Sequence, residues 1–234
     1  MAKVKSRVEI TSKPRVTVLL CALNEEATIA SVLSEVPSWV HEILLVDGNS
    51  TDDTVDKARH VRPDIHVVYQ PGKGKGEAIR YGVQKASGDI IVTLDADGQT
   101  DPGEMPKFIE PILNGYDWAK GSRLTCGRPL NMPWHRWFGN RVLAVTSNIL
   151  YGTRYTDICS GYNAFRKGAF QDLKLSYDSF EMEQQMLVKV KKMGMKVTEV
   201  AHLDAGRIDG VSKISSVKQG FIDWFVIIGE RFRK

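Results

Sequence analysis

The chain alternates between short apolar runs and segments in which apolar residues recur at helical spacing. Apolar runs of strand length, as a buried parallel sheet requires, occupy residues 16–22, 42–46, 64–69 and 89–94. Segments with an apolar residue every three or four positions, which predict helices, occupy residues 25–36, 54–60 and 74–86. This alternation predicts an α/β fold made of βαβ units around a mostly parallel, Rossmann-like sheet flanked by helices.

The regular alternation of strand and helix patterns ends after residue 115. Residues 116–123 predict a strand and its exit loop, and residues 124–133 a loop that contains proline and glycine. The later predicted elements are helices at 134–151, 180–193 and 211–234 and a strand at 196–200. We divide the chain into a flexible lead-in at 1–14, a single α/β domain at 15–210 and an amphipathic C-terminal helix at 211–234.

Composition narrows the class of protein. With 234 residues, 42% hydrophobic and 26% charged, the chain has the make-up of a soluble globular protein with a substantial core. The widely spaced Cys21, Cys126 and Cys159 suit a reducing compartment. Residues 1–13 are polar and basic rather than a secretory signal, and the apolar run at 224–228 is far shorter than the roughly 20 residues that cross a bilayer. We therefore expect a cytoplasmic protein.

The formal net charge of +4 is mild. It permits binding of phosphates or of an anionic membrane surface without demanding nucleic acid. The sequence contains neither an RNP-type aromatic motif nor a zinc finger, and it has no basic helix with heptads. We expect no nucleic-acid partner.

The clearest chemical signal is Leu94-Asp-Ala-Asp-Gly-Gln99, in which two carboxylates directly follow a predicted strand. Acids at such a position are often solvated turn residues, but Asn24 with Glu25 and Asp47 also follow strands. Ligands bind at the carboxyl ends of the strands in sheets of this kind. Mg²⁺ and Mn²⁺ prefer oxygen ligands, so this rim predicts a divalent cation beside a substrate diphosphate.

The segment Pro71-Gly-Lys-Gly-Lys-Gly-Glu77 lies between a predicted strand and a predicted helix. It matches neither the Walker pattern nor Gly-x-Gly-x-x-Gly, in which a glycine would replace Glu77. Two interpretations stay open. The segment is either a flexible loop that opens a helix, or a loop whose backbone and lysines contact a nucleotide or an acceptor.

Several motifs, in serial order from about residue 15 to 215, resemble the family 2 glycosyltransferases with the GT-A fold. The first half supplies Cys21-Ala-Leu-Asn-Glu-Glu26, Val46-Asp-Gly-Asn-Ser-Thr-Asp-Asp-Thr54, Gly72-Lys-Gly-Lys-Gly76, Leu94-Asp-Ala-Asp-Gly-Gln99 and Lys120-Gly-Ser-Arg123. The second half resembles the dolichol-phosphate mannose synthase-like branch, through Arg136-Trp-Phe-Gly-Asn-Arg141, Thr156-Asp-Ile-Cys-Ser-Gly-Tyr162, Phe180-Glu-Met-Glu183 and Arg207-Ile-Asp-Gly-Val-Ser-Lys213.

The resemblance implies a role for each matching residue. The donor nucleotide sugar, GDP- or UDP-linked, would be bound by Ala22, Leu23, Asn24, Glu25, Asp47, Asp95, Ala96, Arg207 and Lys213. The metal, Mn²⁺ or Mg²⁺, would lie among Asp95, Asp97 and Gln99. The catalytic set would be Asp97 with Arg123 and Arg136, the two arginines holding an acceptor phosphate through their planar forks.

The implied reaction is inverting transfer of a sugar to a polyprenyl (dolichyl or undecaprenyl) phosphate. An ionised phosphate needs no general base, whereas a hydroxyl acceptor would need one, for which Asp157, Glu181 and Glu183 are candidates. The alternatives are a family 2 transferase with a soluble or glycan hydroxyl acceptor, a nucleotidyltransferase, and a non-catalytic scaffold that binds nucleotide sugars. A processive polysaccharide synthase is disfavoured, because Pro133 replaces the glutamine of Gln-x-x-Arg-Trp.

A lipid acceptor requires contact with a membrane. Trp134, Trp137 and Phe138 lie beside basic residues in the helix predicted at 134–151, and the last predicted helix has a similar aromatic and basic character. Such helices lie in membrane interfaces. We expect peripheral binding at the cytoplasmic membrane face, with packing on the core or on a second subunit of a homo-oligomer as the alternative.

Overall fold

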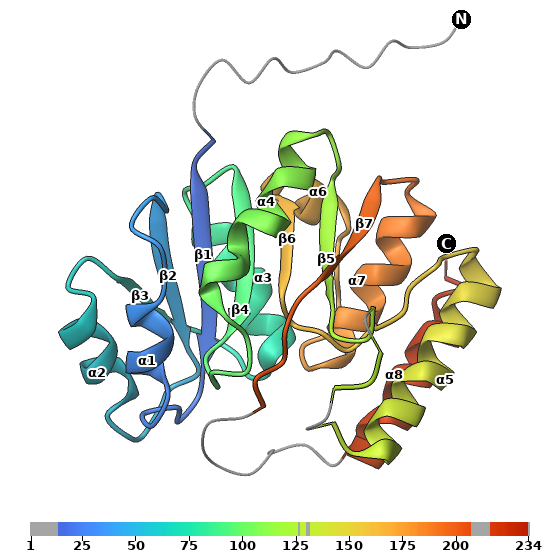
Figure 1. Ribbon diagram of the computed structural model, residues 1–234, viewed down its shortest axis with the longest axis horizontal. Coiled ribbons are helices and arrows are strands. Elements are labelled where there is room, and N and C mark those ends of the chain that lie inside the picture. Colours follow the sequence, from blue (N-terminus) through green and yellow to red (C-terminus); the bar gives the residue numbers. More distant parts are fainter. Residues whose placement is uncertain (1–13, 126, 130–131, 207–215, 234) are drawn as a thin grey trace, which may run out of the picture.

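The computed structural model describes residues 14–125, 127–129, 132–206 and 216–233 (Figure 1). The predicted lead-in therefore lies outside the described residues, apart from residue 14. One sheet of seven strands runs through the structure. The strands are β1 (Val16–Ala22), β2 (Glu42–Asp47), β3 (His66–Tyr69), β4 (Ile90–Asp95), β5 (Trp118–Ser122), β6 (Asn163–Arg166) and β7 (Val197–Ala201).

The order across the sheet is β3-β2-β1-β4-β6-β5-β7. The pairs β1–β2, β1–β4, β2–β3 and β5–β7 are parallel, while β6 is antiparallel to both of its neighbours, β4 and β5. The expected α/β class with a mostly parallel sheet is confirmed. The parallel strands β1, β2 and β4 end at the same edge, which is the edge that carries the predicted site.

Helices cover both faces of the sheet. The helices are α1 (Ile29–Ser34), α2 (Thr54–Val61), α3 (Lys75–Lys85), α4 (Met105–Leu113), α5 (Trp134–Tyr151), α6 (Lys167–Asp172), α7 (Glu181–Lys192) and α8 (Ser216–Gly229), with a short 3₁₀ turn η1 (Pro102–Glu104). Buried side chains of α1, α2 and α4 form one core with the sheet, and those of α3, α6 and α7 form a second core on its other face.

The alternation of side chains along β1 explains how one strand serves both cores. Leu20 belongs to the core beneath α1 and α4, and its neighbour Leu19 to the core beneath α3 and α7. Both side chains are fully buried. A strand buried on both faces must be apolar throughout, which is why β1 reads as a continuous apolar run.

Several elements differ from the prediction, among them the short helix α6, which the sequence analysis does not predict. The sequence analysis predicts no element at β6, because this strand has only four residues and a polar one at each end, although Ala164 and Phe165 within it are fully buried. It also predicts no element at α4, which contains Pro111. The helix expected at 25–36 is shorter, Ile29–Ser34, because the residues that precede Ile29 form a turn instead of continuing the helix.

Helices α5 and α8 pack against each other beside α7, at the end of the sheet that carries β7 (Figure 1). The described part of the predicted C-terminal helix thus joins the rest of the structure through a third core, to which α8 contributes Ile227 and Trp224. Among the helices that the structure describes, none has the length and apolar character needed to cross a membrane.

A buried carboxyl group lies on the inner face of α8. Asp223 is 6% exposed, and Gln219 donates a hydrogen bond of 2.8 Å to it from the preceding turn. Burial raises the pKa of Asp223 to about 7, and the negative charges of Glu183 and Glu181 add to the rise. The native state therefore holds a proton on this group at pH values where an unfolded chain has lost it.

This proton makes stability depend on pH. Because the native state binds more protons between the ordinary pKa of 3.8 and about 7, the free energy of unfolding should fall across that window as the pH rises. Asp223→Asn should remove this contribution and stabilise the protein at pH 8 by up to about 4 kcal/mol. Urea denaturation from pH 4 to pH 8 measures it. The exposed carboxyl control, Asp172→Asn, should retain the wild-type slope, and an unchanged slope in Asp223→Asn would contradict the assignment.

Candidate active site

Three acidic residues lie at the edge where the parallel strands end. In the register of the sheet, Asp47 of β2 lies beside Ala22, and Asp95 of β4 lies beside Cys21, so the two acids flank the end of β1. Asp97 follows two residues after Asp95, and both Asp47 and Asp97 are buried. The structure thus brings together the carboxylates that the sequence analysis expects at this rim.

The loop that follows β1 is bonded to the loop that follows β2. The Asn24 amide nitrogen donates to Ser50 Oγ at 2.9 Å, and Asn24 Oδ1 accepts from the Thr51 amide at 2.8 Å. Asn24 adopts the left-handed conformation, with φ of 53°. The Glu25 amide donates to Thr54 Oγ1 at 2.9 Å. The backbone of the predicted nucleotide-binding segment is therefore held in one shape.

Asp47 closes the turn after β2. Both its carboxylate oxygens accept hydrogen bonds from Ser50, one from the amide at 2.9 Å and one from the hydroxyl at 2.6 Å. Leu23, which lies close to Gly48 in this turn, is 48% exposed. The wall at this side of the rim thus combines a fixed acidic turn with an exposed apolar residue.

Lys75, at the start of α3, joins two carboxylates from different elements. Its Nζ lies 2.6 Å from Asp95 Oδ1 and 2.8 Å from Glu183 Oε1 of α7. Burial on its own lowers the pKa of the lysine, but Asp95 and Glu183 outweigh it, so the pKa is raised and the ammonium stays charged. The sequence analysis assigns Lys75 no partner. Its position inside the glycine-rich loop is the only feature of the sequence that indicates a role for it.

Gly161 packs directly against this charge cluster. A β-carbon at position 161 would lie 2.5 Å from Asp95 Oδ2 and 2.9 Å from Lys75 Nζ. Thr93 of β4 donates a hydrogen bond of 2.8 Å to the carbonyl of Gly161 and holds the backbone in place. Asp95 is thus enclosed by an ammonium group on one side and by a bare backbone on the other.

The turn that carries Asp97 is fixed by backbone contacts. Asp97 Oδ1 accepts from the Gln99 amide at 3.1 Å, and Thr28 Oγ1 donates to the Ala96 carbonyl at 2.7 Å. The Gln99 carbonyl accepts from the amide of Ala205, in the loop after β7, at 3.1 Å. The expected metal-binding residues are therefore positioned by three different loops.

The donor set suits a divalent cation that is held jointly with phosphate. Among the described residues, no three or more His, Cys, Asp or Glu side chains converge as a complete metal site. Mg²⁺ is commonly bound by one or two carboxylates together with substrate phosphates. Asp95 and Asp97 match that arrangement.

The glycines of the 71–77 loop have a packing explanation. Gly74 has φ of 95°, and a β-carbon there would overlap the Asp178 carbonyl. A β-carbon at Gly76 would lie 2.7 Å from the Ser179 carbonyl oxygen. The Glu77 amide donates to the Asp178 carbonyl at 2.9 Å. The glycines therefore let α3 begin directly against the loop before α7, which brings Lys75 to the site.

Arg123, directly after β5, is engaged by Asp157. Its Nε lies 2.8 Å from Asp157 Oδ2 and its Nη2 3.1 Å from Asp157 Oδ1, and Nη2 also donates to the Cys159 carbonyl at 2.9 Å. Asp157 is fully buried. Burial alone would raise its pKa, but Arg123 and its other donors hold that pKa well below its usual range. The Asp157 carboxylate is therefore ill suited to act as a general base.

The other predicted site residues are distributed differently. Arg136 is exposed on the first turn of α5, and its Nε donates to Ser216 Oγ of α8 at 2.9 Å. Glu183, a candidate base, is paired with Lys75. Arg207 and Lys213 lie outside the described residues.

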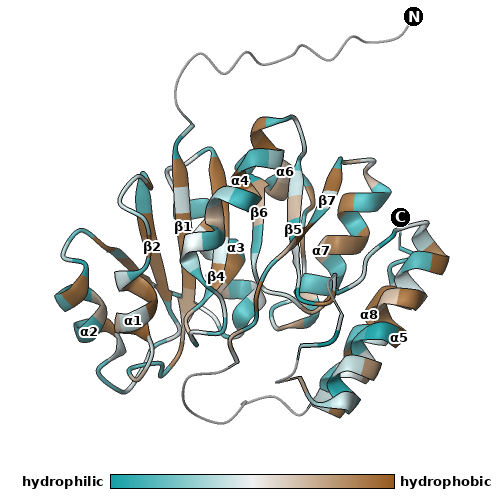
Figure 2. Cartoon of the chain, in the orientation of Figure 1, coloured by the Kyte–Doolittle hydropathy of each residue, from teal (hydrophilic) through white to brown (hydrophobic). Residues whose placement is uncertain are grey.

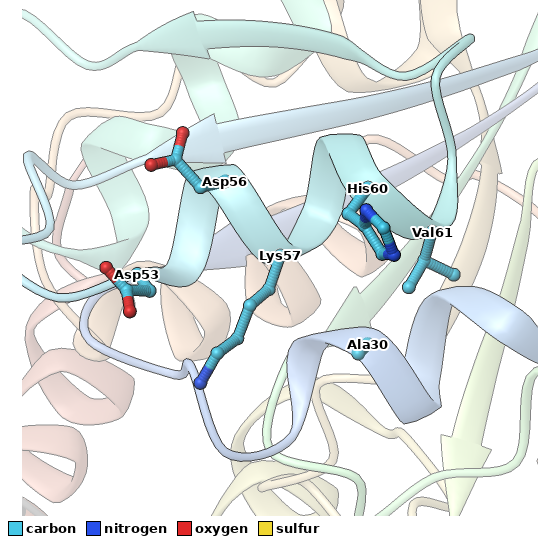
Figure 3. Close-up of a pocket in the computed structure, with 6 residues that line it drawn as sticks. All are labelled: Ala30, Asp53, Asp56, Lys57, His60 and Val61. Carbon is cyan, nitrogen blue, oxygen red and sulfur yellow. The ribbon is translucent and has the colours of Figure 1, made fainter.

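A separate hollow lies between α1 and α2, with a volume of about 330 Å³ (Figure 3). Ala30 and Val61 line it together with Asp53, Asp56, Lys57 and His60. Lys57 forms an ion pair of 3.0 Å with Glu26. None of the carboxylates at the strand ends lines this hollow, and it is distinct from the candidate site.

Comparison with known proteins identifies the family. The model of glycosyl transferase family 2 matches residues 17–174, and the chain belongs to this family. It is a glycosyltransferase. Glycosyltransferase AglJ of Haloferax volcanii is 35% identical over 197 residues, which cover 83% of this chain and 64% of that protein. This chain therefore spans just under two thirds of that relative.

Two further relatives have names that state an acceptor. The dolichol-phosphate mannosyltransferase of Pyrococcus furiosus is 32% identical over 86% of this chain and 59% of its own length. The UDP-N-acetylglucosamine–dolichyl-phosphate N-acetylglucosaminyltransferase of Methanococcus voltae is 30% identical over 78% of this chain and 82% of its own length. The resemblance to the branch of dolichol-phosphate enzymes is confirmed.

The fold is shared with glucosyl-3-phosphoglycerate synthase from Mycobacterium tuberculosis. Its structure in complex with Mn²⁺, UDP and glucosyl-3-phosphoglycerate superposes with a TM-score of 0.74 at 23% identity, covering 92% of this chain and 80% of that one. This likeness confirms the expected GT-A fold.

The cluster around Lys75 can be tested by removing its cation. Lys75→Met leaves Asp95 and Glu183 without their shared partner and should lower the free energy of unfolding by about 3 kcal/mol, the low end for a buried pair because Asp95 is one-third exposed. Adding Glu183→Gln should recover part of this loss. Urea denaturation measures it, with the exposed Lys85→Met of α3 as the control. Equal stability of Lys75→Met and Lys85→Met would contradict the assignment.

Proposed function

We propose that this chain transfers a sugar from a nucleotide-sugar donor to a polyprenyl phosphate at a membrane surface, with inversion of the anomeric centre. The observation that carries the proposal is the position of Arg136. It lies on α5, a helix with an exposed apolar face, while the acidic rim of the sheet provides a site for a nucleotide diphosphate. The two relatives named for dolichyl phosphate support this choice of acceptor.

The acceptor phosphate would attack without help from a base, since a phosphate monoester is largely ionised near neutral pH. A bond forms between a phosphate oxygen and the anomeric carbon, and the bond between that carbon and the donor diphosphate breaks. Arg123 and Arg136 would hold and orient the attacking phosphate. The saturation of Asp157 by its hydrogen bonds favours a mechanism that needs no base from this position.

Asp97, with Asp95 beside it, would hold a divalent cation against the donor diphosphate. A cation bound there would stabilise the negative charge that develops on the departing nucleoside diphosphate. Lys75 would keep Asp95 in a single orientation. The Mn²⁺ and UDP in the glucosyl-3-phosphoglycerate synthase complex, which shares the fold, are consistent with this division of roles.

The membrane would contact the outer face of α5 and α8, a surface that we call the α5–α8 face. Figure 2 shows the two helices together at one end of the sheet, each with strongly hydrophobic segments. Large apolar side chains at helical spacing are exposed on both, namely Trp134, Phe138, Val142, Val145 and Ile149 on α5 and Val217, Phe221, Ile222 and Phe225 on α8.

Around this face the acidic side chains are buried and the basic side chains are exposed. Helix α5 has no acidic residue, and Asp223 of α8 and Glu230 just after it are both buried. The basic residues of this region are exposed, namely Arg136, Arg141, Lys218, Arg231 and Arg233. A basic rim around an apolar face complements an anionic lipid surface.

A transfer assay tests the function. The protein is incubated with Mn²⁺ or Mg²⁺, a panel of radiolabelled GDP- and UDP-sugars and farnesyl phosphate, and label is counted in the organic phase. We expect label that EDTA abolishes. Asp97→Asn should reduce the rate by about 100-fold or more, because it weakens the charge that holds the cation.

The control for this assay is Asp101→Asn, an exposed carboxyl that accepts a hydrogen bond from the Gly103 amide at 2.7 Å. It should keep wild-type activity. If label stays in the aqueous phase but moves onto 3-phosphoglycerate or a glycan, the acceptor is a soluble compound and the lipid assignment is wrong.

Vesicle flotation tests the membrane contact. The protein should float with vesicles that contain phosphatidylglycerol, less so with pure phosphatidylcholine, and binding should weaken with salt. Phe221→Ser together with Phe225→Ser should reduce flotation, since each removes an exposed aromatic ring from the α5–α8 face. Leu113→Ser, an exposed apolar position at the end of α4, is the control. Flotation of the double variant at the wild-type level would reject this face as the contact.

A further inference from the structure

Two asparagines of α5 tie this helix to the segment that follows it. Asn140 Nδ2 donates to Asp157 Oδ1 at 2.6 Å, and Asn140 Oδ1 accepts from the Ile158 amide at 3.0 Å. Eight residues later, Asn148 Nδ2 donates to the Tyr155 carbonyl at 3.0 Å, and its Oδ1 accepts from the Tyr155 amide at 2.9 Å. The two bridges are chemically alike, but Asn148 Oδ1 also accepts from the Thr153 hydroxyl at 2.7 Å, whereas the bridge of Asn140 ends on the carboxylate side chain of Asp157.

That side chain is the centre of a buried network. The Asp157 carboxylate accepts five hydrogen bonds, from the Arg123 amide, Nε and Nη2, from Asn140 Nδ2 and from the Cys159 amide. A carboxylate has about four lone-pair sites, so its acceptor capacity is filled. Asn140 is itself buried. The orientation of Asp157, and through it that of Arg123, is therefore fixed by several elements at once.

The pairing determines which edge of Arg123 can meet a ligand. Of the five guanidinium N–H groups, those on Nε and Nη2 point to Asp157 and the Cys159 carbonyl. The remaining two are on Nη1, which lies 3.7 Å from Asp204 Oδ2, beyond hydrogen-bond distance. Asp157 thus leaves the Nη1 edge, which forms a 3.7 Å ion pair with Asp204, as the part of Arg123 that could donate hydrogen bonds to a ligand.

Arg136 is fixed to the same network through its helix. It precedes Asn140 by four residues, so the two side chains are neighbours on one face of α5. The backbone of α5 therefore connects Arg136 to Asn140, whose side chain is bonded to Asp157 and through it to Arg123. The bridge of Asn148, two turns further along, holds the other end of the helix.

We propose that Asn140 is a positioning residue that, through Asp157, sets Arg123 and Arg136 as a matched pair for one phosphate group of the acceptor. The inference rests on the proposed function, because it assumes that the acceptor carries a phosphate monoester. The recognised chemistry is the same for a lipid phosphate and for a small soluble phosphate. Without Asn140, Arg123 keeps its partner, but α5 and Arg136 lose their side-chain link to it.

The test compares the two asparagines of α5. Binding of farnesyl phosphate and, separately, of 3-phosphoglycerate is measured by calorimetry for wild type, Asn140→Ala and Asn148→Ala, with GDP and UDP in the presence of Mn²⁺ as donor-site probes. Asn140→Ala should weaken binding of the phosphate acceptor by about tenfold, the value of one hydrogen bond to a charged group, and leave nucleotide binding unchanged. Asn148→Ala should lose similar stability and keep acceptor binding.

A second variant gives a readout that a purely structural role would not produce. Asn140→Asp has the same shape, but the introduced carboxyl can donate to Asp157 only when it is protonated. Its pKa should be raised, because it is buried beside a second carboxylate. Acceptor binding by Asn140→Asp should therefore approach wild type at low pH and weaken as the pH rises, while wild type and Asn148→Asp show no such trend.

Each outcome is decisive. If Asn140→Ala and Asn148→Ala weaken acceptor binding equally, or neither does, Asn140 is only a structural tether and the proposal fails. If Asn140→Ala does not fold, the pH dependence of Asn140→Asp decides. Wild type that binds only 3-phosphoglycerate rejects the lipid acceptor but leaves the pairing intact. Wild type that binds neither phosphate rejects both.

Discussion

The parallel pairing of β1 with β2 on one side and β4 on the other is the constraint on which the site depends. Parallel strands end at a common edge, so the turns that follow them must share one rim. The register then places Asp47 and Asp95 beside consecutive residues of β1. A shift of one residue in either ladder would exchange the side chains that pack in the two cores, so the packing on both faces of the sheet also fixes the spacing of the carboxylates.

Buried charged groups throughout the site region are paired with groups of opposite charge. Lys75 lies between Asp95 and Glu183, and Arg123 is paired with Asp157. Removing one partner of such a group is costly, because the other is left uncompensated in a medium of low polarity. These groups contribute little net stability, but each has one favourable orientation. The rim is therefore preorganised, which is the property that electrostatic catalysis requires.

Much of this architecture could be predicted from the sequence. The strands β1, β2 and β4 are mostly apolar, β2 and β4 end in acids, and Glu25 follows the end of β1 by three residues, so their type and the position of the rim follow from the pattern alone. The short strand β6 could not be predicted, because its four residues acquire their role from pairing with two distant strands. Antiparallel insertion of this kind depends on tertiary contacts and leaves no periodic signal.

Among the site residues, too, some could be predicted from the local sequence and others depend on tertiary contacts. Acids after strands could be recognised by position, whereas the partners of Lys75 and Arg123 come from segments 20 or more residues away and become visible only in three dimensions. The glycine-rich loop shows the limit of motif reading. Its glycines allow close approach of two backbones, and the chemically important residue is the lysine between them.

The close packing of Gly161 against the charge cluster has a consequence for how the sequence can evolve. A β-carbon at this position would displace only the ends of two flexible side chains, Asp95 and Lys75, so the fold would tolerate alanine while the charge cluster would not keep its geometry. A single substitution can therefore change the geometry of the cluster without removing any of its three charged groups. In a lineage that no longer used the site, selection on its chemistry would no longer keep glycine at this position, and a side chain there would mark the loss.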